Sequence, residues 1–408
     1  MNATVFDQLQ SALQQQGPLA AIDQLCQRLR EDREYHALFY ALLLRKRHEL
    51  GVNPVPTGPA DELPAELHDP YEEGIRQAAR EVGALLLQAG NLPHAWHYFR
   101  MIGENAPVKA ALDKYEPGDD EDIQPLVQIA YYEGVHPTRG FDWILSRYGL
   151  CNAITTVSSS DLSHPKEARD YCIRALVRTL YHDLRHRLAA EIQARWNTPA
   201  PGADAPPDTP GIVRQLIQDR DWLFADDAYH VDTSHLSSVV QLSATLDPCL
   251  ELSMARELCA YGAKLSRRFG TPDDPPFENG YRDLDIYLGI LNGEDIEAGL
   301  AHFRAKIESY DLQEIGTYPV EVLVNLLLRL NRGPEALELA RKYLVGAERQ
   351  GRQLTCPNLN ELCQRLKAYD TLAEVARELN DPVYYLAGLL AARQAASGVT
   401  GSVAQPEK

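Results

Sequence analysis

Apolar side chains recur along most of this chain at the three- and four-residue spacing of an amphipathic helix. Leu19, Ile22, Leu25 and Leu29 form an early example, and comparable stripes follow toward the C-terminus. The alternation of apolar and polar residues that is typical of a half-buried strand is almost absent. The pattern therefore predicts an all-α protein.

A strongly apolar stretch over residues 37–50 predicts a helix, and its basic end suits the negative end of the helix dipole. The segment that follows is rich in proline. Because proline cannot continue a helix, we expect an extended connection there. The prolines concerned are Pro54, Pro56, Pro59, Pro64 and Pro70.

Residues 71–107 carry the most informative pattern: a helix, a turn at 89–91 and a second helix. The small residues Gly83 and Ala95 would let the two helices approach closely, while Leu86 and Phe99 would fill the space around that contact. With Pro107 ending the unit, this spacing resembles a tetratricopeptide repeat (TPR).

Weaker copies of the same helix-turn-helix pattern recur further along, and together they cover roughly two thirds of the chain. The resemblance implies an α-solenoid of stacked helical hairpins that acts as a scaffold for a protein or peptide partner. The small or turn residues that mark these copies are Gly134, Gly293, Ala298, Ala336, Ala340, Ala373 and Ala376.

The middle of the chain departs from the repeat plan. Residues 165–195 predict one uninterrupted helix of about 30 residues, which is longer than a repeat helix. A polar run with serines at 158–160 precedes it as a loop with capping residues, and a Pro/Ala-rich linker, 197–211, follows it. We therefore expect four regions: a TPR-like region 1–150, a central region 151–248, a TPR-like region 249–396 and a disordered tail 397–408.

Composition narrows the classes of function. The chain has 408 residues, of which 45% are hydrophobic and 24% charged, enough for a sizeable core. A net charge of −18 disfavours binding to nucleic acid and to anionic membranes. No apolar run is long enough to span a bilayer, and no secretory signal is present. Seven scattered cysteines favour a reducing compartment, so we expect a cytoplasmic protein.

His182 and His186 lie four residues apart on the long central helix, so both could bind one metal ion. The motif matches the zincin pattern only in part, because no glutamate occupies the position of the general base. Both histidines point away from the apolar face, toward Arg178 and Arg185. The alternative is a solvated cationic helix face.

A second cluster follows the linker, with Asp226, Asp227, His230, Asp232 and His235 within ten residues. These side chains could complete a divalent metal site, for zinc or iron, that the histidine pair begins. Alternatively, Asp232 caps a helix that starts near Ser234.

A third candidate lies in the turn around Gly134, with Glu133, His136, Arg139 and Asp142. Glu133 and His136 are candidate ligand-binding residues there, although His136 could instead cap the next helix. On the central helix, Arg174, Arg178 and Arg185 could hold an anionic ligand, or could pair with the surplus of acidic residues.

Two functions follow from these patterns. The first is a helical-repeat scaffold that binds a protein or peptide, with some of its twenty tyrosines available to line a groove. The second is an enzyme or small-ligand binder whose histidine and aspartate pocket surrounds the central helix. No phosphate loop, dinucleotide motif or nucleophile elbow accompanies the candidates.

Overall fold

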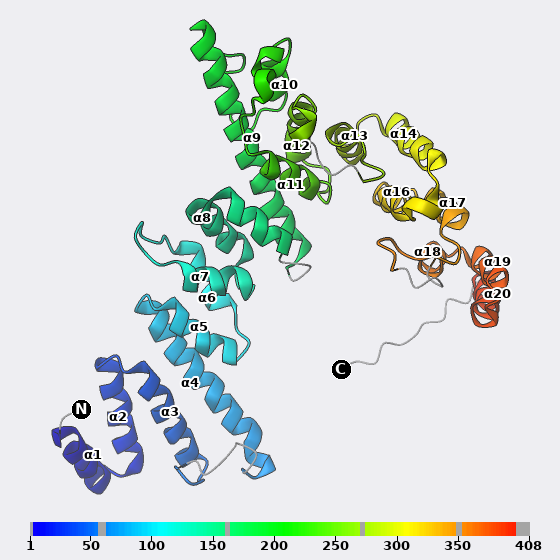
Figure 1. Ribbon diagram of the computed structural model, residues 1–408. Helices are drawn as coiled ribbons and strands as arrows, with labels where there is room; N and C mark the ends of the chain where they lie inside the picture. The colour runs from blue at the N-terminus through cyan, green and yellow to red at the C-terminus, as the bar shows by residue number, and fades with distance from the viewer. Residues whose placement is uncertain (1–2, 56–62, 160–163, 270–273, 348–352, 397–408) are drawn as a thin grey trace. The chain divides into compact units, whose positions relative to one another are not determined.

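The computed structural model describes the chain except for residues 1–2, 56–62, 160–163, 270–273, 348–352 and 397–408 (Figure 1). Every regular element within the described residues is helical and none is a strand, which confirms the all-α prediction. None of the described helices combines the length and the apolar character that a bilayer span requires. The tail predicted to be disordered lies outside the described residues.

The chain divides into two compact units, and the boundary falls between residues 156 and 169. The first unit contains the helices up to α8 and the second begins with the long helix α9.

In the first unit, α1 to α5 pack in chain order, each helix against the next. Helix α8 contains a break at Gly149, where φ is +78°. It continues to Ser159, so the serines predicted to lie in a loop at 158 and 159 are helical. The elements are α1 (Ala3–Gln16), α2 (Pro18–Glu31), α3 (Tyr35–Glu49), η2 (Ala65–Leu67), α4 (His68–Gln88), α5 (Leu92–Met101), α6 (Ala106–Lys114), α7 (Gln124–Val127), the π-helix η3 (Gln128–Tyr132) and α8 (Pro137–Ser159).

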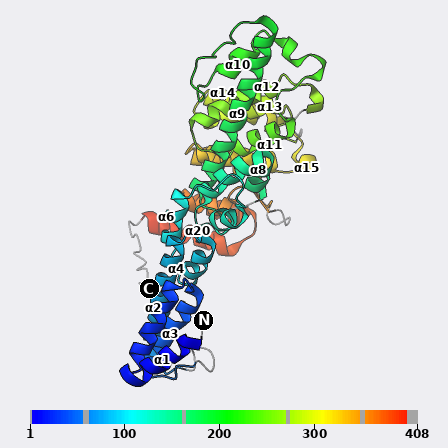
Figure 2. The same ribbon diagram turned by 90° about the vertical axis from the view of Figure 1, so that its left-hand side faces the viewer.

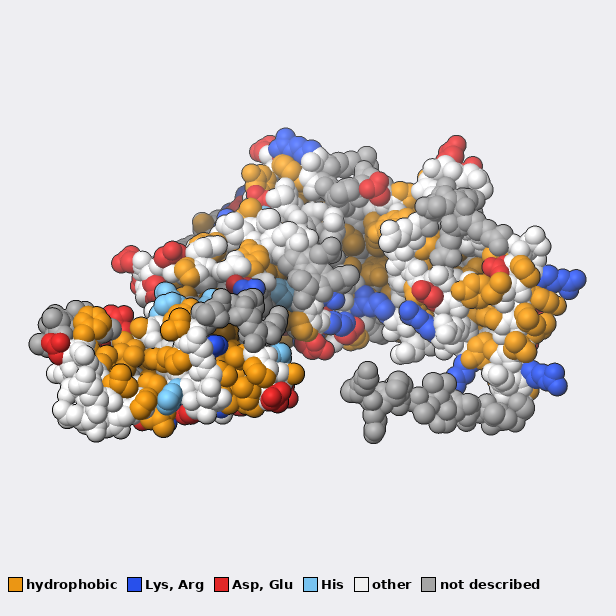
Figure 3. All heavy atoms as spheres, turned by 90° about the horizontal axis from the view of Figure 1, so that it is seen from below, with side chains coloured by type: hydrophobic (Ala, Val, Ile, Leu, Met, Phe, Trp, Pro, Cys, Tyr) orange, Lys and Arg blue, Asp and Glu red, His pale blue; other side chains and the backbone are white. Residues whose placement is uncertain are grey.

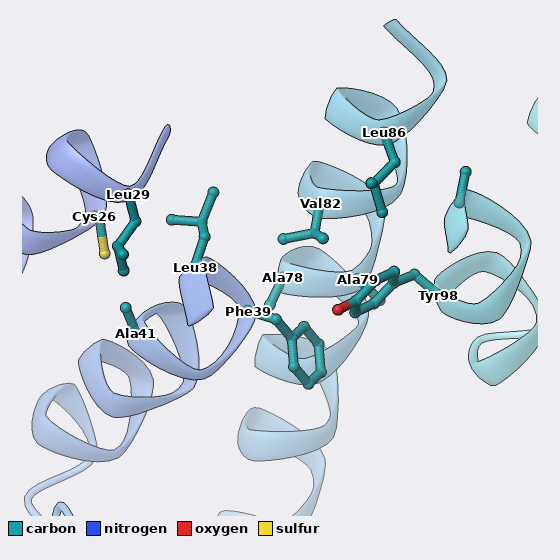
Figure 4. Packing of buried hydrophobic residues seen from close by; sticks show 11 residues of the cluster. Cys26, Leu29, Leu38, Phe39, Ala41, Ala78, Ala79, Val82, Leu86 and Tyr98 are labelled. Carbon is teal, nitrogen blue, oxygen red and sulfur yellow. The ribbon is translucent and has the colours of Figure 1, made fainter. Parts of the chain in front are cut away.

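A continuous core joins α2, α3, α4 and α5 (Figure 4). Phe39 and Tyr98 contact each other across it, with ring centroids 5.3 Å apart. Gly83 lies against the ring of Phe99, and a Cβ atom added there would be only 2.7 Å from that ring. Gly90 forms the turn with φ +76°, which favours glycine. The predicted close approach of α4 and α5 at Gly83 is therefore confirmed.

The second unit begins with α9, whose 31 residues confirm the predicted long helix. Figures 1 and 2 both show α10, α11 and α12 beside it. From α11 to α20, successive helices pack on one another, except that α14 packs against α16 and passes over the short α15. The elements are α9 (Lys166–Trp196), α10 (Ile212–Ile217), η4 (Asp221–Asp227), α11 (Thr233–Ser243), α12 (Leu250–Gly262), η5 (Arg267–Phe269), α13 (Tyr281–Leu291), α14 (Ile296–Ser309), α15 (Leu312–Ile315), α16 (Tyr318–Arg329), α17 (Gly333–Tyr343), α18 (Leu359–Arg365), α19 (Tyr369–Glu378) and α20 (Pro382–Ala396).

The small residues of the weaker repeat copies are buried at two of the three helix pairs in this unit. Ala336 and Ala340 of α17, and the alanines predicted in α19, are buried as expected. Between α13 and α14 the contact is made one residue later than predicted. Ala298 is exposed, and the close approach occurs at Gly299, where an added Cβ would be 2.5 Å from Ile290. The resemblance to tetratricopeptide repeats itself stays a prediction.

Candidate functional site

The apolar face of α9 is buried as the sequence predicts, and on the opposite face His182, Arg185 and Arg178 are bonded within the chain. His182 Nε2 lies 2.9 Å from a carboxylate oxygen of Asp208, and His186 is exposed. Arg185 donates to four backbone carbonyls of the Pro/Ala-rich segment, those of residues 202, 205, 206 and 207. The guanidinium predicted to bind an anion is therefore occupied by neutral acceptors of the chain.

The segment 197–211, predicted to be a linker, is thus folded against α9. Glu257 of α12 fixes its end. This buried carboxylate accepts bonds from the backbone N–H groups of Gly211, Val213 and Arg214 at the start of α10. Tyr181 of α9 donates to the carbonyl of Thr209, 2.9 Å away. The second half of this segment is therefore part of the packed unit.

His230 is buried and bridges α12 to α9. Its backbone N–H donates to the hydroxyl of Tyr261, and its ring nitrogens lie 3.0 Å from that hydroxyl and 2.8 Å from Glu191. Because the hydroxyl already accepts the backbone bond, it can donate to Nδ1, which leaves the proton on Nε2 facing Glu191. Burial lowers the pKa of His230, and the charge of Glu191 only partly offsets this. His230 is therefore a neutral structural residue at pH 7.

Asp232 confirms its predicted alternative as a helix cap. It accepts bonds from the backbone N–H groups of Ser234 and His235 at the start of α11. The bond from the Ser234 hydroxyl and the one from the His235 N–H lower the pKa of the Asp232 carboxyl. Asp227 pairs with Arg268 at 3.2 Å.

These separate partners argue against the predicted metal centre. In the part of the chain that the structure describes, no three histidine, cysteine, aspartate or glutamate side chains are arranged to hold a metal ion. The hypothesis that His182, His186, His230, Asp232 and His235 together bind zinc or iron is therefore not supported.

Arg178 forms an ion pair with the buried Glu251 of α12, at 2.5 Å. The alternative in which the arginines of α9 pair with carboxylates therefore holds for Arg178. The pair links α9 to α12, so it contributes to packing within the second unit.

In the first unit, Glu133 accepts bonds from the indole N–H of Trp96 at 2.6 Å and from Arg100 at 3.0 Å. His136 caps α8, since its Nδ1 accepts the backbone N–H of Arg139, and its other ring nitrogen lies 2.5 Å from Asp113. The accepting Nδ1 places the proton on Nε2, facing that carboxylate. Both candidate ligand-binding residues thus hold the turn in place.

An open groove lies elsewhere in the second unit, between α11, α13 and α16. It has a volume of about 530 Å³, which is in the range of ligand pockets. We call it the groove. Its lining mixes aromatic, aliphatic and amide side chains: Gln241, Ala244, Thr245, Asp274, Phe277, Leu284, Tyr287, Tyr318, Val322, Asn325 and Thr355.

Arg329 holds the wall that follows α11. Its guanidinium donates to the backbone carbonyls of Ala244, Thr245 and Leu246, and it lies 3.8 Å from Asp247. These carbonyls belong to the C-terminal end of α11, where acceptors lack helical partners. The lining residues at 244 and 245 are therefore fixed by a cation from α16.

Lys306 of α14 holds the wall formed by residues 274–277. The half-buried ammonium donates to the carbonyl of Pro276 at 2.6 Å and to the buried carboxylate of Asp283. Burial raises the pKa of Asp283, but the bonds from Lys306 and His302 outweigh it and hold that pKa below its usual value. The carboxylate thus stays charged and keeps Lys306 in place beside Pro276.

Glu321 holds the third wall, which contains Thr355. This buried carboxylate of α16 accepts bonds from the backbone N–H and the hydroxyl of Thr355, each 2.7 Å long, and from the hydroxyl of Thr317. Asn325, one helical turn further, donates to the carbonyl of Thr355 at 3.1 Å. All three walls are therefore bonded to charged side chains from behind, which leaves the lining side chains facing the groove.

The groove was not predictable from the sequence, because its lining comes from five separate segments. One local pattern could have indicated it. Tyr318, Val322, Asn325 and Arg329 share one face of α16 and mix aromatic, apolar, amide and charged groups, which is unusual for a face that only packs.

A second exposed apolar surface lies on α20, where hydrophobic side chains gather in Figure 3. Val383, Leu386 and Leu390 are each more than half exposed, while Gly388 packs closely against α19. These side chains lie open at the surface, so the groove is the better-defined candidate site.

No known protein family, curated protein or solved structure matches this chain.

Proposed function

We propose that this chain is a TPR-like helical-repeat scaffold whose groove binds a short peptide segment of a protein partner. The observation that carries the proposal is the groove with its three anchored walls. The cavity of about 530 Å³ is large enough for a few side chains, and walls held by internal bonds reduce the ordering that a bound peptide would require. Stacked helical hairpins commonly present such extended surfaces to partner proteins.

The lining supports a peptide over a polar metabolite. Phe277, Tyr287 and Tyr318 offer aromatic surface for side chains, while Gln241 and Asn325 carry amides that can bond a peptide backbone. Asn325 uses its amide nitrogen for Thr355, which leaves its oxygen as an acceptor toward a ligand.

The remaining properties agree with a protein partner inside the cell. The net charge of −18 disfavours nucleic acid as the ligand. All seven cysteines are free, which favours a reducing compartment and supports a cytoplasmic location. The alternative of a divalent-metal enzyme around α9 has no comparable support, because no three candidate ligands among the described residues are arranged to hold a metal ion.

The test is binding of a peptide library by the purified full chain and by two tyrosine variants. Tyr318→Ala removes an exposed aromatic side chain from the groove, and Tyr384→Ala makes the same change on α20 as the control. We expect wild type and Y384A to bind the same library members and Y318A to lose at least fivefold in affinity, which is about 1 kcal/mol. Absence of binding, or equal binding by all three proteins, would overturn the proposal.

A further inference from the structure

The groove carries an excess of negative charge among the described residues. Asp274 lines it, is exposed and forms no ion pair within the described residues. Glu321 lies behind the wall at Thr355 and is bonded to hydroxyl and amide donors, which leave its charge uncompensated. The buried side chain is therefore a source of negative potential in a region of low dielectric.

The cation on the same face of α16 is already engaged. Arg329 donates to three backbone carbonyls, and Asp247 lies 3.8 Å from its guanidinium. An incoming carboxylate would have to displace those bonds to pair with Arg329. A partner with acidic side chains would instead face Asp274 and Glu321, and the chain's overall charge of −18 adds repulsion at long range.

The aromatic side chains fit the stem of a long cationic residue. Tyr318 is about half exposed, with a relative accessibility of 48%, and Phe277 is partly exposed on the neighbouring wall. Lysine and arginine can lay their methylene groups along such rings while the charged end stays near water or a carboxylate. Burial, together with the charges of Glu321 and Asp274, raises the pKa of Tyr318, so both carboxylates act on the same ring.

We infer that the groove selects a basic peptide segment, in which the stem of a lysine or arginine lies against Tyr318 and Phe277 and its cationic head faces Asp274. The inference rests on the proposed function, because it names the chemistry of the segment that the groove binds. It does not involve the histidines of α9.

The experiment uses arrays of random nine-residue peptides with equal apolar content and net charges of +3, 0 and −3. Fluorescently labelled full-length chain is applied to all three. We expect binding mainly to the +3 peptides and tightest binding to members that combine lysine or arginine with apolar residues. Equal binding to the neutral or acidic peptides would overturn the inference but leave the proposed function standing. No binding to any array would overturn both.

A basic preference could also arise from the overall acidity of the chain, so three charge variants locate it. Asp274→Asn should lower the affinity for the best-binding +3 peptide about twofold to fivefold in anisotropy titrations, as expected for one exposed ion pair. Asp274→Lys should lower the same affinity about tenfold, because the new lysine would repel the cationic side chain of the peptide. Asp204→Lys makes the same change of net charge on an exposed residue outside the groove.

Wild-type affinity in D204K, with losses in both Asp274 variants, is the result expected. Equal losses in D204K and D274K would show that general electrostatics attracts the peptide, and would overturn the assignment to the groove. Urea midpoints of the variants identify any loss that comes from unfolding.

Discussion

The face of α9 that carries His182, Arg185 and His186 differs from the groove in what its polar side chains contact. On α9, Arg185 and His182 reach outward and bond the segment 197–211. At the groove, Arg329, Lys306 and Glu321 bond backbone groups of the walls from the side away from the cavity. The lining side chains therefore stay accessible. Charged residues therefore complete the fold at both places, and at the groove they do so from behind the lining side chains.

In the described residues, the densest groups of histidines, aspartates and arginines do not form a metal site, and the groove is lined by other residue types. His182, His230, Arg178 and Arg185 are each bonded to a partner within the chain, while His186 is exposed. The groove is built from tyrosines, amides and threonines that no catalytic motif would select, and its charged residues act mainly at a distance or as anchors.

The largest predicted effect is on stability, at Glu257. Glu257→Ala should lower the free energy of unfolding by about 3 kcal/mol, because the N–H groups at the start of α10 would be buried without an acceptor. Urea denaturation followed by circular dichroism measures it. Glu314→Ala, an exposed site on α15, is the control and should change stability by less than about 0.5 kcal/mol. A similar small change in both would show that residues 197–211 are not held through Glu257.

A matched pair of arginine variants separates the two regions. Arg185→Gln and Arg329→Gln should each cost about 1 to 2 kcal/mol, because each removes several charge-assisted bonds to carbonyls. Hydrogen exchange should rise near residues 202–207 in R185Q and near 244–247 in R329Q. Peptide binding should weaken only in R329Q. Weakened binding in R185Q alone would contradict the assignment of the ligand to the groove.

The pH dependence of stability tests the buried histidine. Burial lowers the pKa of His230 in the folded chain, whereas the pKa of this side chain in the unfolded chain is about 6.5. The unfolded state therefore binds more protons as pH falls, and the stability present above about pH 6.5 is lost on acidification. The unfolding free energy of wild type should fall relative to His230→Gln between pH 7 and pH 5. A difference that stays constant across this range would show that His230 does not titrate differently on folding.

The smallest effect is expected at the histidine pair itself. The double variant with His182→Ala and His186→Ala should change stability by less than about 0.5 kcal/mol, because both side chains are at the surface. Elemental analysis of the wild-type chain should find no stoichiometric zinc or iron. Stoichiometric metal that disappears in the double variant would revive the metal hypothesis.

Much of the local structure was predictable from the sequence, because it depends on nearby residues. Helical spacing predicts the apolar face of α9 and the close approach of α4 and α5 at Gly83. Capping chemistry predicts the role of Asp232. The cap at His136 was one of two alternatives, and the structure selects it.

The rest depended on partners distant in sequence. Asp208 is 26 residues from His182, and Glu257 is 46 residues from Gly211, so no periodicity connects them. The lining of the groove extends from Gln241 to Thr355, and its residues become neighbours only after the helices pack. The one-residue error at Gly299 has a similar cause, because two adjacent small residues fit the helical spacing almost equally well.

The most direct test of the central claim is a parallel anisotropy titration of one labelled peptide, the best binder of the +3 array, with three proteins. These are wild type, Tyr318→Ala in the groove and the double histidine variant on α9. We expect at least a fivefold loss of affinity in Y318A and no change in the histidine variant. Unchanged affinity in Y318A with a loss in the histidine variant would overturn the proposed site and place peptide binding on α9.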